Sequence, residues 1–183
     1  MRFSTKAFDP NKDLTPETLA TLFEAARWAP SSLNEQPWRY LIFTKTNPDP
    51  RRKAEACLNT GNAPAKNAPL LILSFAKRSL TEQDRRNRFH MHDLGMANLS
   101  LVIQAVGLGL VTLQMGGYDR ELARASFGIS SDFTLGPMIA VGHYGDPDLD
   151  AENREEESLP RIRRPLADTA FDGALERPFD FGV

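Results

Sequence analysis

The chain has 183 residues, of which 41% are hydrophobic and 25% charged, a composition typical of one folded globular domain. Its 22 lysines and arginines against 24 aspartates and glutamates leave a net charge of -2, so no global positive field draws it to nucleic acid or to an anionic membrane. The single Cys57 excludes an internal disulfide framework, and no apolar run has signal-peptide or membrane-spanning character, so a cytoplasmic protein is expected.

The amino-terminal half is expected to alternate helices and strands. Thr15 and Pro16 are a capping residue and a first-turn proline, which begin an amphipathic helix that Pro30 ends. The later elements are a strand, a short helix, a loop and a buried strand, at 39–44, about 51–58, 59–64 and 69–75.

The stretch from Thr81 to Val106 contains no proline and has apolar residues at helical spacing, which predicts one long, buried central helix capped by Gly107. A strand, a short helix and a strand are then expected at 110–113, 120–127 and 138–141. The order predicts an α+β fold in a single domain, 1–183. Its tail, 146–183, is acidic up to Glu157 and basic from Arg161, and it has too few apolar residues to pack alone. We expect this tail to stay loose or to lie on the domain or on a partner subunit.

Two loops are rich in groups that can contact a ligand. The segment 31–36, here called the hydroxyl–amide loop, carries Ser31, Ser32, Asn34 and Gln36 between a helix and a strand, and suits a ligand with carbonyls, ring nitrogens and hydroxyls. A simple helix cap and turn is equally compatible with it. The segment 115–118, the glycine loop, holds Gly116 and Gly117, which allow close approach to backbone N–H groups; an ordinary tight turn is the alternative.

Basic residues occur at both ends of the chain and in the first part of the predicted central helix. Arg2 and Lys6 flank Ser4, and Arg161, Arg163 and Arg164 lie near the carboxyl end. Such groups can converge on a phosphate dianion or can simply be solvated. The run 85–88 is expected to be a solvated helix face and not a nucleic-acid site. His90 and His92, two residues apart on that helix, are expected at a surface or interface and cannot share a metal ion, so no metal site is predicted.

These segments, in this order, resemble the nitroreductase family of flavoproteins over nearly the whole chain. The most specific similarity is the block from Ala25 to Trp38, with its Ala-Pro-Ser-Ser run. The other segments that resemble the family are 2–8, 93–97, 105–109, 116–118, 140–145 and 161–166.

The resemblance implies a mixed β-sheet sandwiched by helices, and a homodimer formed through the long central helix with FMN at the subunit interface. It implies that NAD(P)H is the reductant and that small electron-poor organic molecules, such as nitroaromatics or quinones, are the acceptors in a ping-pong reaction. The family's chemistry is carried by FMN, so no side chain is expected to be catalytic; the Gly116 backbone N–H is expected near the flavin N5. The implied flavin-binding residues are Arg2, Ser4, Lys6, Ser31, Ser32, Asn34, Gln36, Met115, Gly116, Gly117, Arg161 and Arg163.

Two departures from the family pattern affect what is expected of the substrate. Lys6 stands where an Arg is usual, which keeps the charge but loses the bidentate fork. The chain also lacks the long inserts that shape the substrate pocket in larger members. A dehalogenase, a semialdehyde reductase, a non-catalytic flavin carrier or sensor, and a domain with a degenerate site therefore stay open as alternatives.

Overall fold

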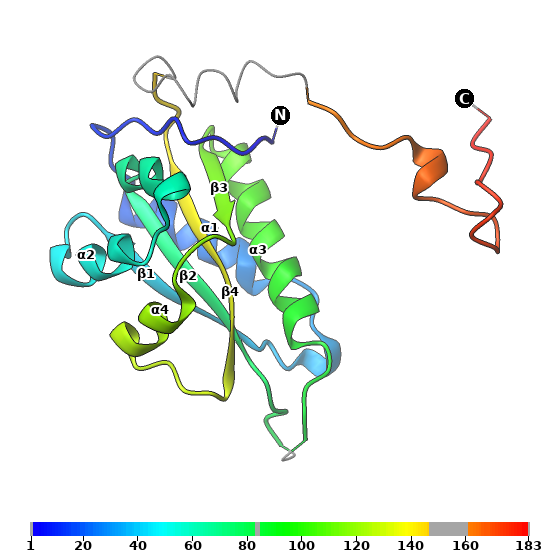
Figure 1. Cartoon of the computed structure of the whole chain (residues 1–183), viewed down its shortest axis with the longest axis horizontal. Coiled ribbons are helices and arrows are strands. Elements are labelled where there is room, and N and C mark those ends of the chain that lie inside the picture. The colour runs from blue at the N-terminus through cyan, green and yellow to red at the C-terminus, as the bar shows by residue number, and fades with distance from the viewer. Residues whose placement is uncertain (1, 83–84, 147–160, 183) are drawn as a thin grey trace.

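A computed structural model describes residues 2–82, 85–146 and 161–182, and shows a four-stranded sheet with helices on both faces (Figure 1). The strands are β1 (Trp38–Thr44), β2 (Leu70–Lys77), β3 (Val111–Met115) and β4 (Phe133–Gly142). The helices are α1 (Pro16–Arg27), α2 (Pro48–Ala56), α3 (His90–Gly107) and α4 (Arg120–Phe127). Short 3₁₀ helices occupy Ser32–Asn34, Thr60–Asn67 and Leu166–Asp168. The α+β class is confirmed.

The sheet has the strand order β1-β2-β4-β3, and its three strand pairs are all antiparallel. The parallel pairing expected of a mixed sheet is found at the amino-terminal segment, where Ser4 forms an isolated parallel bridge with Thr112 on β3. Further along, Phe8 pairs with Tyr144, and Gly145 N–H donates to Ala7 O over 3.0 Å. The amino-terminal residues therefore lie along the edge of β3.

Alternation along β2 separates two hydrophobic cores. Leu70 and Ile72 pack with the buried residues of α1 and α3, whereas Leu71 and Leu73 pack with those of α2 and α4. All four side chains are completely buried, as expected for a central strand covered on both faces. The sheet is therefore sandwiched by helices, as the sequence predicts.

Local capping sets two of the helix boundaries where the sequence places them. The Thr15 hydroxyl accepts from the backbone N–H of Thr18 over 3.2 Å at the start of α1. Asp119 Oδ1 accepts from the N–H of Leu122 over 2.8 Å at the start of α4. Gly128 ends α4 in the left-handed conformation, with φ of 61°.

The predicted start of the central helix at Thr81 is wrong, because α3 begins at His90. Residues 78–82 and 85–87 form the two arms of a hairpin instead, in which Leu80 N–H donates to Arg85 O over 2.8 Å. The run 85–88 is thus not a helix face. His90 is buried, and its ring nitrogens contact Asn87 O and Thr134 Oγ1. At the other end, Gly107 is the last helical residue and Leu108 the cap.

Two further details differ from expectation. The predicted loop 59–64 lies in the 3₁₀ helix Thr60–Asn67, which Asn59 caps with its side chain. The predicted strand 138–141 is part of a longer strand, β4. Among the described residues, no helix combines the length and apolarity needed to cross a membrane.

One face of α3 carries exposed apolar side chains. Met91, Leu99 and Ile103 follow one another at helical spacing, and Leu99 and Ile103 are 44% and 58% exposed. The described tail, 161–182, extends away from the sheet and helices (Figure 1) and also exposes apolar side chains, among them Leu175 and Phe179. Residues 147–160, most of the predicted acidic segment, lie outside the described residues.

Candidate functional site

The hydroxyl–amide loop is tied to the first turn of α3 through one carboxylate. Asp93 Oδ2 accepts from Ser31 Oγ over 2.9 Å and from the backbone N–H of Ser32 over 3.0 Å. Ser31 Oγ also accepts from the N–H of Gln36 over 2.8 Å, which closes the loop on itself. Asp93 is buried and lies at the positive end of the helix dipole. The loop is therefore held in one conformation by bonds that span the chain.

This loop contains three non-glycine residues with positive φ. Leu33, Asn34 and Gln36 have φ of 54°, 56° and 46°, a region that L-residues rarely adopt. Such residues cost on the order of 1–3 kcal/mol each and persist where the surrounding structure fixes them. Gln36 Nε2 donates to Asn34 Oδ1 over 3.0 Å, so the two predicted amide groups lie together. The side chain of Leu33 is exposed.

The glycine loop follows β3 directly and is supported from the segment 57–62. Met115 ends the strand and is buried. Asn62 Nδ2 donates to Gly117 O over 2.8 Å, and Asp119 N–H donates to Cys57 O over 2.8 Å. A side chain on Gly117 would overlap the amide of Asn59, which explains why glycine is needed there.

Tyr118 anchors the carboxyl end of the glycine loop. Its hydroxyl donates to Gly136 O over 2.7 Å. Burial raises the pKa of Tyr118, an effect that the nearby Arg120 partly opposes, so the phenol keeps its proton and its hydrogen bond at neutral pH. The end of the loop is therefore fixed to β4.

Gly116 differs from its neighbour because nothing in the chain requires a glycine there. Its φ is not positive, and a Cβ at this position would meet no atom within 4 Å among the residues compared. The residue is exposed. The backbone of Gly116 therefore borders free space beside the end of β3, as a group that approaches a ligand closely must.

The basic residues at the two ends of the chain are only partly brought together. Arg2 Nη1 donates to Ser4 Oγ over 3.4 Å, and the bridge from Ser4 to Thr112 sets this pair beside β3, the strand that leads to the glycine loop. Arg161 and Arg163 are exposed on the tail. Neither forms a hydrogen bond with the amino-terminal segment in the ranges that the structure describes.

Sequence reasoning missed three residues that shape these loops. Asp93 was visible as an acid in an apolar helix, but its partner Ser31 is 62 positions away. Asn62 is only one of several amides in its segment, and Asn87 was assigned to a helix face. Across 2–82, 85–146 and 161–182, no three His, Cys, Asp or Glu residues are grouped as metal ligands would be.

Comparisons with known proteins point to the nitroreductase family. Residues 1–64 match the model of the Nitroreductase family. The oxygen-insensitive NAD(P)H nitroreductase of Salmonella typhimurium is 27% identical over 212 residues, which cover 92% of this chain and 94% of the relative. A crystal structure described as an oxidoreductase containing FMN is 33% identical, with a TM-score of 0.86, and the match covers 94% of this chain and 88% of that one. A nitroreductase family protein from Streptococcus pneumoniae has the same fold, with a TM-score of 0.72 at 20% identity over 93% of this chain and 96% of its own.

Proposed function

This chain belongs to the nitroreductase family, and we propose that it is a homodimeric, FMN-dependent oxidoreductase that uses NAD(P)H to reduce electron-poor acceptors. A relative that is named an NAD(P)H nitroreductase and a solved relative that contains FMN support this assignment. When bound, FMN would take two electrons from NAD(P)H and pass them to the acceptor in a second half-reaction. The chain's own part is to hold, orient and shield that group.

The open space beside Gly116 is the observation that carries the proposal. A flat ring system can lie against backbone there only if no side chain fills the space, and none does. The N–H of Gly116 is the donor we assign to the flavin N5, with Met115 and Gly117 as neighbouring contacts. Met115 in β3 holds the loop before Gly116, and the bonds from Asn62 to Gly117 and from Tyr118 to Gly136 hold it after Gly116, so this donor is kept in place.

Charged groups along the amino-terminal edge suit the other end of the cofactor. Arg2, Ser4 and Lys6 supply two cations and a hydroxyl beside β3, and phosphate dianions are bound best by such a set. We assign Arg161 and Arg163, on the projecting tail, to the same phosphate and ribityl chain.

A second subunit completes the site in this proposal. Ser31, Ser32, Asn34 and Gln36 are held rigidly on the α3 side of the sheet, from where they would reach the flavin of the partner. The exposed stripe on α3 and the apolar side chains of the tail are the surfaces that a partner would cover. Analytical ultracentrifugation at low concentration tests this point, and a folded, flavin-loaded monomer would contradict it.

The central test is the purified protein itself. It should carry FMN, and anaerobic addition of NADH or NADPH should bleach the flavin absorbance. A nitroaromatic or quinone should then restore it. Absence of flavin would sink the proposal, and a flavin that neither nucleotide reduces would point to the carrier or sensor.

The phosphate assignment has a test of its own. Arg163→Ala should weaken FMN binding by about 1.5–3 kcal/mol, because one charge-assisted hydrogen bond is lost. Equilibrium titration of the flavin-free protein measures the change, with the exposed Arg52→Ala as control. Full flavin occupancy in a variant that lacks both Arg161 and Arg163 would overturn the assignment.

A further inference from the structure

The hairpin between β2 and α3 presents three arginines that its own fold does not use. Its two arms, 78–82 and 85–87, are held together by backbone bonds: Leu80 N–H donates to Arg85 O, Asn87 N–H donates to Arg78 O, and Ser79 pairs with Arg86. The side chains of Arg85, Arg86 and Arg88 are exposed, and they form no ion pair in the parts of the chain that the structure describes. Replacing these side chains should therefore leave the hairpin intact.

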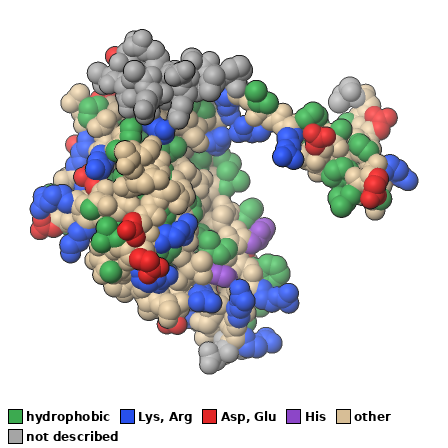
Figure 2. Space-filling view, viewed as in Figure 1, with side chains coloured by type: hydrophobic (Ala, Val, Ile, Leu, Met, Phe, Trp, Pro, Cys, Tyr) green, Lys and Arg blue, Asp and Glu red, His purple; other side chains and the backbone are tan. Residues whose placement is uncertain are grey.

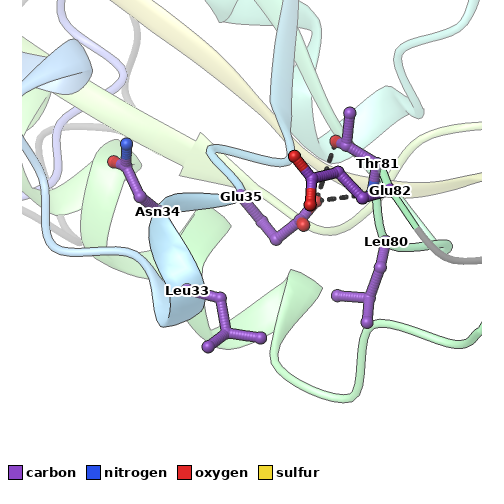
Figure 3. Close-up of a pocket in the computed structure, with 6 residues that line it drawn as sticks. All are labelled: Leu33, Asn34, Glu35, Leu80, Thr81 and Glu82. Carbon is purple, nitrogen blue, oxygen red and sulfur yellow. Dashed lines mark hydrogen bonds between the residues drawn. The ribbon is translucent and has the colours of Figure 1, made fainter.

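The hairpin and the hydroxyl–amide loop border an open surface cavity of about 500 Å³. This volume is within the range of small-molecule sites, about 300–1,000 Å³. Its lining combines apolar and basic side chains: Leu33, Leu80, Phe89, Arg85, Arg86 and Arg88. Figure 3 shows Leu33 and Leu80 facing the same gap between the two segments, and Figure 2 shows Lys and Arg side chains gathered at this end of the molecule.

A buried donor in the cavity wall lacks a partner. Asn87 is 2% exposed, and its Nδ2 is the buried side-chain nitrogen or oxygen without a hydrogen bond among the residues described. Its Oδ1 accepts from Phe89 N–H over 3.0 Å, which fixes the orientation of the amide. Buried donors are nearly always paired, so this nitrogen is an unsatisfied group beneath the surface of the cavity wall.

Acidic side chains also border this region. The Glu35 carboxylate accepts from both the N–H and the hydroxyl of Thr81, each over 2.9 Å, and these bonds fix its position beside the cavity (Figure 3). Glu82 lines the adjoining cavity, which shares Leu33 and Leu80 with this one. The amino terminus of α3 already has the buried Asp93 carboxylate in its first turn, so the three arginines are the positive groups that a ligand would meet.

We propose that this cavity binds the anionic group of a small, flat substrate, with the arginines contacting a carboxylate or phosphate and the apolar residues contacting its body. The inference rests on the proposed function, because Ser32 belongs both to the cavity wall and to the loop assigned to the flavin. An acidic aromatic acceptor and the 2′-phosphate of NADPH share this chemistry.

Calorimetry without any reductant tests the site directly. The protein as purified is titrated with 4-nitrobenzoate and with its neutral counterpart 4-nitrobenzamide. The variant Arg85→Gln, Arg86→Gln, Arg88→Gln should bind nitrobenzoate about tenfold more weakly, since its charge-assisted bonds are lost, with a much smaller change for nitrobenzamide. The matched variant with three lysines should keep most of the preference, and Arg52→Gln on α2 should keep all of it. Added salt should weaken the binding of the anionic nitrobenzoate but not that of the neutral nitrobenzamide.

Stopped-flow reduction separates the two sources of the anion. A selective loss with NADPH relative to NADH in the glutamine variant assigns the arginines to the 2′-phosphate, and a selective loss of nitrobenzoate binding assigns them to the acceptor. The glutamine variant must melt like the wild type for the comparison to count. If it then still prefers nitrobenzoate to nitrobenzamide and NADPH to NADH as strongly as the wild type does, the inference is overturned. If neither nucleotide reduces the flavin, the proposed function fails, while arginine-dependent binding of nitrobenzoate would still uphold the cavity as an anion site.

Discussion

The hydroxyl–amide loop and the glycine loop are built in opposite ways. The first contains strained residues and is fixed by side-chain bonds to Asp93 on a helix remote in sequence. The second has backbone that is fixed at both ends and left open at Gly116. In the hydroxyl–amide loop, strained backbone lowers stability but orients hydrogen-bonding groups. In the glycine loop, the absence of a side chain at Gly116 leaves space beside the backbone. Both are features of a surface prepared for a ligand.

The largest effect should come from removing the carboxylate that fixes the first loop. Asp93→Ala leaves the Ser31 hydroxyl and the Ser32 N–H without an acceptor, and each such loss costs about 1–3 kcal/mol. For a chain of this length, each kcal/mol corresponds to about 2–4 °C in Tm. The two losses together come to about 2–6 kcal/mol, so thermal unfolding should show a fall of about 4–24 °C.

Asp93→Asn is the matched control, because it keeps one acceptor oxygen in the same place. We expect it to retain more than half of the stability that Asp93→Ala loses. Equal melting temperatures for Asp93→Ala and the wild type would show that the loop is held by something other than this carboxylate.

A smaller effect, on rate and not on stability, is expected at Gly116. Gly116→Val should slow flavin reduction by NAD(P)H about tenfold, since a branched side chain would fill the space assigned to the ring. Gly116→Asn should be slow too. Its φ is not positive, so the tolerance of Asn for left-handed backbone gives no relief.

The neighbouring glycine sharpens this contrast. Gly117→Ala would place its methyl group against the Asn59 amide, so it should lower the melting temperature. Gly116→Val should leave that temperature nearly unchanged. Wild-type reduction rates in both Gly116 variants, measured by stopped-flow, would remove this loop from the flavin site.

The sequence predicts those parts of the structure that depend on local rules. The cap at Thr15 and the bounds of α4 follow from residues within one turn. The start of α3 was misplaced because no proline or glycine interrupts 81–89, and the hairpin bonds between backbone groups leave no signal in the sequence. Asn87 was the available clue, since its side chain bonds the N–H of Phe89 as residues at turns do.

The candidate site shows the same division. Its loops are recognisable from their composition, but the bonds that fix them are not. Ser31 meets Asp93 across 62 positions, and Asn62 meets Gly117 across 55, so the fold must be known before either pair is visible. The tail arginines, whose assignment depends on a second subunit, stay a prediction.

The smallest effect we expect concerns the support beneath the glycine loop. Asn62 Nδ2 donates to Gly117 O over 2.8 Å in a half-buried position, and such a bond contributes about 0.5–1.5 kcal/mol. Asn62→Ala should therefore lower Tm by a few degrees and weaken FMN binding several-fold, because the loop that carries Gly116 gains freedom.

The variant Asn62→Asp distinguishes a role of this hydrogen bond from a role of side-chain packing alone. It keeps the shape but sets a carboxylate against the Gly117 carbonyl, where no donor remains, so it should be worse than alanine in both measurements. An aspartate variant that melts and binds flavin like the wild type would show that the amide donor does not support the loop.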